Sequence, residues 1–263
     1  MAIQLNERDY LIFKLLAEHN VLLEKHIAWF IAQEDKPVLI RDRLRKLFYL
    51  DYLLCERYDE KLPWWTTPTK PLVYKLAPLA KAMTGFKNQE GETSDNAQEQ
   101  KSLEIANIRM IFLIAQNEGL LQNLQWKTAL PVQNNTQRFD ALISCSSQSV
   151  NHNLGLLSHP DLDDQFAVRI AQGLAQKDVT GVMIISRDQA HQENMQKLLA
   201  DYRSQTNANK VIFAIHQDLY KGGIDKVQWS NVAGEQINFF NQSEAVAISL
   251  PGHSQAFMDI HAA

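Results

Sequence analysis

The sequence lacks a long apolar run and an apolar leader. Of its 263 residues, 45% are hydrophobic and 21% are charged. These values are ordinary for globular proteins, but no run of about 18 apolar residues occurs. Met1 is followed by polar residues rather than by a basic and then an apolar segment. We therefore expect neither a secretion signal nor a membrane span, and no membrane partner.

Cysteine and catalytic motifs are also scarce. Cys55 and Cys145 lie far apart, without metal-ligand spacing around them, so free thiols in a reducing cytoplasm are expected. The eight histidines are scattered, and neither a serine nucleophile elbow nor a phosphate-binding loop is present. These absences favour a protein with no catalytic centre, bound metal or cofactor, although enzymatic activity stays open at this point.

Negative charge is unevenly distributed along the chain. The net charge of −4 by itself argues against nucleic acid as a partner. Residues 1–86, however, hold 13 Lys and Arg against 11 Asp and Glu, whereas the remainder holds 13 against 19. Any contact with a phosphate backbone is therefore expected in the first third of the chain.

Within that third, residues 37–49 concentrate positive charge. They begin with a proline, which suits the first turn of a helix. The apolar residues at helical spacing are Ile40, Leu44, Leu47 and Phe48, and the clustered cations are Arg41, Arg43, Arg45 and Lys46. A helix with an apolar back and a basic front suits DNA recognition, with Arg43 at a base edge and the other three cations at phosphates. An ordinary solvated helix face is the alternative.

The preceding residues predict two more helices. Residues 7–19 are amphipathic and follow Asn6, a favourable N-cap, and residues 21–32 are amphipathic as well. His19 and His26 are expected to face solvent or a polar pocket. Together with the basic helix, these segments form three short, tightly connected helices, which is the pattern of a helix-turn-helix.

A hairpin with a long loop follows. Strands are expected near 53–58 and 72–76, and a helix over 77–86 is expected to end at Gly85. The loop is the predicted wing of a winged helix, and its candidate DNA contacts are Lys61, Trp64, Trp65 and Lys70. The tryptophans could stack on DNA or form a dimer contact. The alternative is that they pack back on the body of the protein.

The remaining sequence predicts a linker and a second domain. Residues 87–100 hold no large apolar residue and are rich in Gln, Glu, Asn and Ser, so they predict a linker. Residues 101–263 continue with a long helix, three strands, a helix, a buried strand, a helix and a strand over 210–218. This order predicts an α/β sheet domain of ordinary size. The glycine pair Gly222–Gly223 predicts a turn.

The first domain resembles the replication-relaxation winged-helix proteins of plasmids and integrative elements, through residues 5–31, 41–58 and 72–83. Relaxases of the MOBC type have a similar architecture, which couples a winged helix to a domain similar to the PD-(D/E)XK restriction-endonuclease core. The second domain resembles that core in its order of a long helix, a strand ending in Trp126, a strand, a helix and an apolar strand. The resemblance implies a two-domain α/β protein with a winged helix over 1–86, a linker and a restriction-endonuclease-like sheet.

Residue by residue, the resemblance implies an incomplete metal centre. Asp140, after Phe139, stands where the family has the aspartate of Pro-Asp, and Lys127 stands where it has a glutamate after the tryptophan. The residues in place of Glu-x-Lys are Gly155, Leu156 and Leu157. Such a centre needs at least two carboxylates for Mg²⁺ and a lysine that orients the nucleophile. The aspartates that follow, Asp161, Asp163 and Asp164, are expected to cap the next helix instead.

We interpret the chain as a DNA-binding protein of a mobile genetic element, acting at a transfer or replication origin in plasmid mobilization and conjugation. It would be a relaxosome or replication accessory factor. Its expected partners are double-stranded DNA and a relaxase or other transfer or replication proteins, with the inactive nuclease-like domain serving homodimerisation or docking. One alternative is an active metal-dependent relaxase or nuclease that uses Asp140. Another is an adaptor that binds protein through Trp64 and Trp65.

Overall fold

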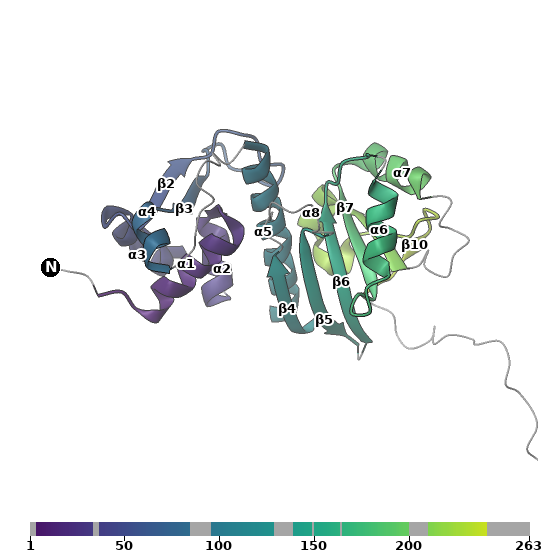
Figure 1. The fold of residues 1–263 in the computed structure, drawn as a ribbon, viewed down its shortest axis with the longest axis horizontal. Helices are drawn as coiled ribbons and strands as arrows, with labels where there is room; N and C mark the ends of the chain where they lie inside the picture. The colour runs from purple at the N-terminus through teal and green to yellow at the C-terminus, as the bar shows by residue number, and fades with distance from the viewer. Residues whose placement is uncertain are drawn as a thin grey trace, which may run out of the picture.

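The protein has a mixed α/β fold with two separate sheets. The computed structural model describes residues 4–33, 37–84, 96–128, 139–148, 150–163, 165–199 and 210–240. A three-stranded sheet with its helices lies on one side of a long helix, and a seven-stranded sheet lies on the other (Figure 1). In this part of the chain, no helix combines the length and apolarity needed to cross a membrane.

Three helices open the chain where their hydrophobic periodicity predicts them. They are α1 (Glu7–His19), α2 (Glu24–Ala32) and α3 (Pro37–Tyr49). α1 begins in a capping box, in which the side chains of Asn6 and Asp9 each accept the other's backbone N–H. The second helix begins later than expected, because Leu22–Leu23 forms strand β1 and pairs with Val73 and Tyr74.

The hairpin and a fourth helix complete the small sheet. They are β2 (Leu53–Arg57), β3 (Leu72–Leu76) and α4 (Pro78–Thr84). The three strands are antiparallel in the order β1-β3-β2. Side chains of α1, α2, α3 and the strands share one core, in which Phe13, Ile27, Leu44 and Leu47 are fully buried. The expected end of the fourth helix at Gly85 lies outside the described residues.

Helix α5 (Asn96–Asn117) connects the two sheets. It begins before residue 101, so the last part of the expected linker is helical, and residues 85–95 lie outside the described part. Ala106 of α5 joins the core of the small sheet, whereas Ile108 and Phe112 join the core of the large one. A helix with apolar residues around its circumference is buried on more than one side, and α5 is therefore shared by both cores.

The large sheet has the strand order β10-β9-β8-β7-β6-β5-β4. Its strands are β4 (Gln122–Thr128), β5 (Ala141–Ser147), β6 (Val150–Ser158), β7 (Gly181–Ser186), β8 (Val211–Ile215), β9 (Trp229–Ser230) and β10 (Gln236–Ile237). β6, β7 and β8 are parallel, and the outer pairings are antiparallel. The three strands expected after the long helix and the buried strand that follows them are all present.

Helices cover both faces of this sheet (Figure 1). α6 (Phe166–Leu174) and α7 (Gln189–Leu198) lie on one face, and α5 and α8 (His216–Lys226) lie on the other. Alternate strand residues supply the two cores, since Val182 and Ile184 pack with α6 and α7 whereas Met183 and Ile185 pack with α5 and α8. Such alternation follows from the two-residue period of a strand.

The strand predicted over residues 210–218 was wrong at its end. It ends at Ile215, and α8 begins at His216, where burial of Leu219 and Ile224 in the core holds the helix. The turn predicted at Gly222–Gly223 agrees with the backbone of Gly223, which has a φ of 69° and a ψ of −170° and separates two helical segments within α8.

A partly buried contact joins the first two helices to α5. Arg109 of α5 lies 3.1 Å from the Glu18 carboxylate and 2.8 Å from Nε2 of His19, with its guanidinium carbon 4.7 Å from the centre of the Phe30 ring. His19 and His26 are both buried, so His19 does not face solvent. The pKa of each is lowered to about 3, mainly by burial and in addition by nearby positive charge, from Arg109 at His19 and from His19 and Lys25 at His26.

We expect stability to fall on acidification because of these two histidines. Each is neutral when folded but protonates near its ordinary pKa of 6.5 when unfolded, so below that pH the unfolded chain binds more protons. The free energy of unfolding should then decrease by roughly 1 kcal/mol per pH unit and per histidine between about pH 6 and pH 4. Urea unfolding at several pH values measures it. His26→Gln should reduce the slope by one histidine's share, and an unchanged slope would contradict the assignment.

Candidate functional site

The exposed face of α3 carries three of the predicted DNA-binding residues, Arg41, Arg45 and Lys46. Ile40, Leu44 and Leu47 are at most 2% exposed and fix the back of the helix in the small core. The residues exposed along the front are Arg41, Asp42, Arg45, Lys46 and Tyr49. They follow one another at intervals of one and three residues, so they share one helix face. The predicted apolar back is confirmed for Ile40, Leu44 and Leu47 but not for Phe48, which is 39% exposed.

Two of the predicted contacts are engaged within the protein. Arg43 donates from Nε to Oδ1 of Asp9 at 2.6 Å, and its Nη2 pairs with the other oxygen of this fully buried carboxylate. The Arg41 guanidinium pairs with Glu24 of α2 at 2.8 Å. Arg45 and Lys46 are exposed and form no ion pair within the described part of the chain. A base contact by Arg43 stays a prediction, but it would require the buried pair with Asp9 to break.

The predicted wing folds back instead of projecting. Trp64 is only 4% exposed, packs with Leu103 of α5, and has its ring 4.9 Å from the ring of His216. Trp65 is partly buried and donates from Nε1 to the carbonyl of Thr69 at 2.7 Å. Trp64 therefore packs on the body of the protein, as the alternative prediction had it. A DNA contact through its buried ring does not fit this structure.

The two wing lysines remain on the surface. Lys61 is exposed, and Lys70 is exposed and pairs with Asp59 at 2.5 Å. The loop thus presents its lysines to solvent while its first tryptophan anchors it. A contribution of the loop to DNA binding stays a prediction for Lys61, Lys70 and the partly buried Trp65.

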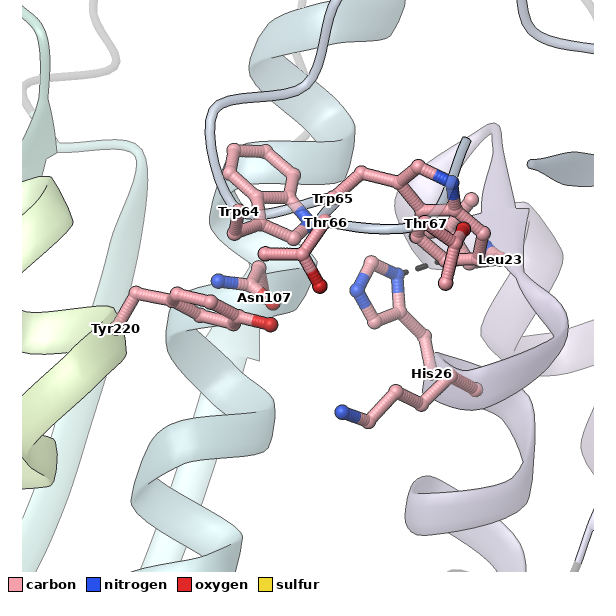
Figure 2. Close-up of a pocket in the computed structure, with 9 residues that line it drawn as sticks. Leu23, His26, Trp64, Trp65, Thr66, Thr67, Asn107 and Tyr220 are labelled. Atoms are coloured by element: carbon pink, nitrogen blue, oxygen red, sulfur yellow. Dashed lines mark hydrogen bonds between the residues drawn. The ribbon is translucent and has the colours of Figure 1, made fainter. Parts of the chain in front are cut away.

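A pocket of about 220 Å³ lies where the wing loop meets α2, α5 and α8 (Figure 2). It is lined by Leu23, Lys25, His26, Trp64, Trp65, Thr66, Thr67, Asn107 and Tyr220. His26 points into it and accepts a long hydrogen bond of 3.5 Å from the backbone N–H of Leu23. The sequence analysis missed Asn107 and Tyr220, because nothing local brings these helices to the loop.

Asp140, the aspartate implied by the resemblance, has both oxygens occupied. It lies just before β5, where Lys101 of α5 contacts its Oδ1 at 2.8 Å and the backbone N–H of Ser158 donates to its Oδ2 at 2.7 Å. The β6 residues in place of Glu-x-Lys are buried within the sheet. Lys127 lies on β4 and pairs with Leu142 of β5. Among the described residues of β6, no carboxylate accompanies Asp140.

The ring of Phe139 explains why β6 has no side chain at residue 155. A Cβ atom built on Gly155 would lie 2.4 Å from this ring, and one built on Gly173 of α6 would lie 2.2 Å from it. Phe139 is 7% exposed and belongs to the core beneath α6. It therefore occupies the space that a longer side chain at this strand position would need.

The aspartates after β6 lie at the start of α6. Asp163 accepts from Nη1 of Arg169 at 2.8 Å and from the backbone N–H of Gln165 at 3.1 Å. Asp161 is exposed, and Asp164 lies outside the described residues. The contacts of Asp163 fit the predicted helix-start role, although Gln165 rather than an aspartate holds the N-cap position.

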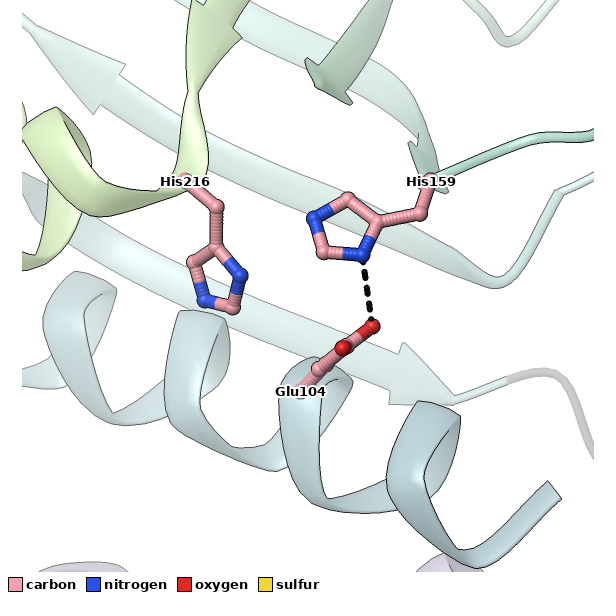
Figure 3. Close-up of side chains that lie close together, drawn as sticks. All are labelled: Glu104, His159 and His216. Atoms are coloured by element: carbon pink, nitrogen blue, oxygen red, sulfur yellow. Dashed lines mark ion pairs between the residues drawn. The ribbon is translucent and has the colours of Figure 1, made fainter. Parts of the chain in front are cut away.

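A second polar cluster lies at the carboxyl ends of the parallel strands (Figure 3). His159 follows β6, His216 follows β8, and Glu104 projects from α5 towards them. Since parallel strands end at the same edge of a sheet, residues distant in sequence meet there. The ligand atoms of the three side chains lie within 4.8 Å of one another. We name this set the histidine–glutamate cluster.

The cluster is buried and only partly hydrogen-bonded. His159 has a φ of 44°, in the left-handed region, and its Nδ1 lies 2.9 Å from Oε2 of Glu104. Burial raises the pKa of Glu104, but the hydrogen bond and charge of His159 outweigh it, so that pKa is lowered. Burial, together with the charge of His159, lowers the pKa of His216 to about 4, despite the opposite effect of Glu104.

Sequence reasoning missed this cluster. Its members are separated by more than fifty residues at each step, so no spacing rule for metal ligands applies. One usable signal was present, because each histidine comes directly after an apolar strand. The position of α5, which supplies Glu104, at the carboxyl edge of the parallel strands could be known only from the tertiary structure.

Comparisons with known proteins give little support to any family. No family model matches the chain, and no curated protein matches its sequence. A solved structure, of restriction endonuclease FokI bound to DNA, is similar over 84% of this chain and 46% of that chain, at 11% identity and a TM-score of 0.31. This chain therefore spans less than half the length of that protein. A similarity this weak supports no inference about activity.

Replacing Arg43 by alanine is expected to destabilise the protein, because the buried Asp9 carboxylate loses its cation. Breaking a buried pair costs about 3 kcal/mol, which corresponds to a melting temperature lower by about 6–12 °C for a chain of this size. Thermal unfolding measures it. The matched control Arg45→Ala removes an exposed cation and should change stability by less than about 0.5 kcal/mol. Equal losses for both variants would contradict the anchoring role.

Gly155→Ala is expected to lower stability by about 1–3 kcal/mol, because the new methyl group overlaps the Phe139 ring. Phe139→Ala removes that ring at its own cost. In the double variant the overlap is gone. Its loss of stability should therefore be smaller than the sum of the losses measured for the two single variants. Denaturant unfolding of the three variants gives the coupling energy. Strictly additive losses would show that Phe139 does not exclude a side chain at residue 155.

Proposed function

We propose that this chain binds double-stranded DNA through the exposed face of α3. The observation that carries the proposal is the arrangement of that helix, whose apolar back is fixed in the core while Arg45 and Lys46 face solvent without ion pairs in the described structure. Cations held on a rigid helix can neutralise phosphates and release counterions. An unpaired surface cation keeps its charge available for that purpose.

The roles of the four α3 cations differ in this proposal. Arg45 and Lys46 contact phosphates, and Arg41 contributes from the edge of the face, where Glu24 holds it. Arg43 acts as a positioning residue, because its pair with Asp9 sets α3 against α1. Tyr49 is 74% exposed on the same face and extends the contact surface. The basic face therefore depends on two free cations rather than four.

We further propose that the first 86 residues form a winged-helix domain. Supporting this, three helices precede a hairpin, and a short strand between the first two helices joins the hairpin in one antiparallel sheet. Its wing differs from a free DNA-contacting loop, since Trp64 anchors it beside α5 and only Lys61 and Lys70 remain available. The resemblance of this region supports a cytoplasmic role at a transfer or replication origin of a mobile element, beside a relaxase or replication protein.

Two alternatives are less well supported by the geometry. A nuclease or relaxase centred on Asp140 lacks a second carboxylate on the described residues of β6, and Lys101 already pairs with the aspartate. A protein-binding adaptor that uses Trp64 would need a ring that is now buried. If the chain acts as a relaxosome or replication accessory factor, we also expect it to form a homodimer through the large sheet.

Charge removal on α3 tests the proposal. Lys46→Gln and Arg45→Gln should each weaken binding to a random duplex and should each lower the slope of log affinity against log salt by about 1, since one phosphate contact is lost. Fluorescence anisotropy across a salt series measures both. The matched control Lys197→Gln removes an exposed cation from α7, across the large sheet from α3 (Figure 1).

The control and a nicking assay separate the alternatives. Lys197→Gln should leave the affinity and the slope unchanged, and an effect equal to that of Lys46→Gln would refute the α3 interface. Absence of any salt-dependent binding would support the adaptor. Mg²⁺-dependent nicks in supercoiled DNA that disappear with Asp140→Ala would establish the nuclease.

A further inference from the structure

We propose that Glu104, His159 and His216 form a binding site for a divalent transition-metal ion, with Zn²⁺ as the best match. The proposal concerns the histidine–glutamate cluster and does not depend on DNA binding. Two imidazoles and one carboxylate are a ligand set typical of zinc sites that keep a fourth position open. Imidazole nitrogens also select transition metals over Mg²⁺ and Ca²⁺, which prefer oxygen ligands.

The separation of the three side chains is close to what such a site requires. Their ligand atoms lie within 4.8 Å of one another. In a tetrahedral zinc site, bonds of about 2.0–2.2 Å place neighbouring ligand atoms about 3.3 Å apart. Binding therefore needs these ligand atoms to approach one another by up to about 1.5 Å, which rotation of the imidazole and carboxylate side chains can provide.

Unused hydrogen-bonding capacity in the cluster points to a missing ligand. His216 is 3% exposed, and neither of its ring nitrogens has a hydrogen-bond partner among the described residues. Nε2 of His159 is also buried without a partner there. Leaving a buried polar atom unpaired is unfavourable, and a metal ion would satisfy one of the His216 nitrogens.

The surrounding structure holds the three ligands in place. Glu104 is on α5, which is fixed by both cores, and each histidine directly follows a strand of the central parallel sheet. The left-handed backbone at His159 accompanies the turn of its side chain towards α5. The Trp64 ring lies against His216 and shields it from solvent. Ligands that are already held in place favour metal binding, because binding then requires little rearrangement of the protein.

The proposed site differs from the one that the nuclease resemblance implies. That centre would use Asp140 and Mg²⁺, whereas this cluster does not include Asp140. Asp140 and the cluster lie close in space, since Asp140 accepts a hydrogen bond from the backbone N–H of Ser158, the residue before His159. A variant of Asp140 therefore separates the two possibilities.

Metal binding to the full-length protein after removal of metals by a chelator tests the proposal. One equivalent of Zn²⁺ should bind, measured by calorimetry. At a free concentration of about a hundred times Kd, the melting temperature should rise by about 5–10 °C. Mg²⁺ at the same concentration should leave it unchanged. One equivalent of Co²⁺ should give the visible absorption of a four- or five-coordinate nitrogen and oxygen site.

Matched variants locate the bound ion. His216→Gln and Glu104→Gln should each weaken Zn²⁺ binding by roughly a hundredfold or more, above the usual loss from an outer-shell change. His152→Gln removes another buried histidine at the opposite end of β6, and Asp140→Asn removes the nearby acid. Both should keep the wild-type affinity. The proposal is overturned if the wild-type protein binds no equivalent of Zn²⁺, if His216→Gln retains full affinity, or if Asp140→Asn loses it.

Discussion

The fold depends on the burial of α5 between two cores. Its apolar residues pack on the small sheet through Ala106 and on the large one through Phe112, while its polar residues make four ion pairs with residues of other segments. Those pairs are Glu99 with Lys75, Lys101 with Asp140, Glu104 with His159, and Arg109 with Glu18. A helix used in this way cannot move without disturbing both sheets. The N-terminal elements and the large sheet are therefore mechanically joined.

This junction decides which N-terminal surface remains available. The loop between β2 and β3 is committed to α5 and α8 through Trp64, so it cannot reach outward with its aromatic tip. α3 lies away from the junction, and its basic front stays open to solvent (Figure 1). Within that front, Asp9 and Glu24 restrain Arg43 and Arg41. Of the four cations, Arg45 and Lys46 thus have no ion-pair partner among the residues that the structure describes.

The carboxyl edge of the parallel strands gathers the remaining polar chemistry. Asp140 lies beside it with both oxygens occupied, and the Phe139 ring fills the space in front of Gly155. The histidine–glutamate cluster occupies the same edge and still has nitrogens without partners in the described structure. The edge where α/β sheets usually bind ligands therefore has buried imidazole nitrogens without partners among the described residues, whereas the aspartate nearby is held in an ion pair with Lys101.

The sequence by itself determined the elements whose signals are local. Helix α1 with its Asn6 cap, the basic helix α3, the hairpin and strand β7 follow from periodicity and capping between residues a few positions apart. Only the tertiary structure decided the pairing of Leu22–Leu23 with β3, the helix that begins at His216, the buried position of Trp64 and the pair between Arg43 and Asp9. Each of these depends on a partner distant in sequence; Arg43 and Asp9, for example, are 34 residues apart. Each also depends on burial, which raises the free-energy cost of leaving a charge without a counterion or an aromatic ring without packing partners. Local patterns contain no information about such partners, and for that reason the candidate sites became visible only in the folded chain.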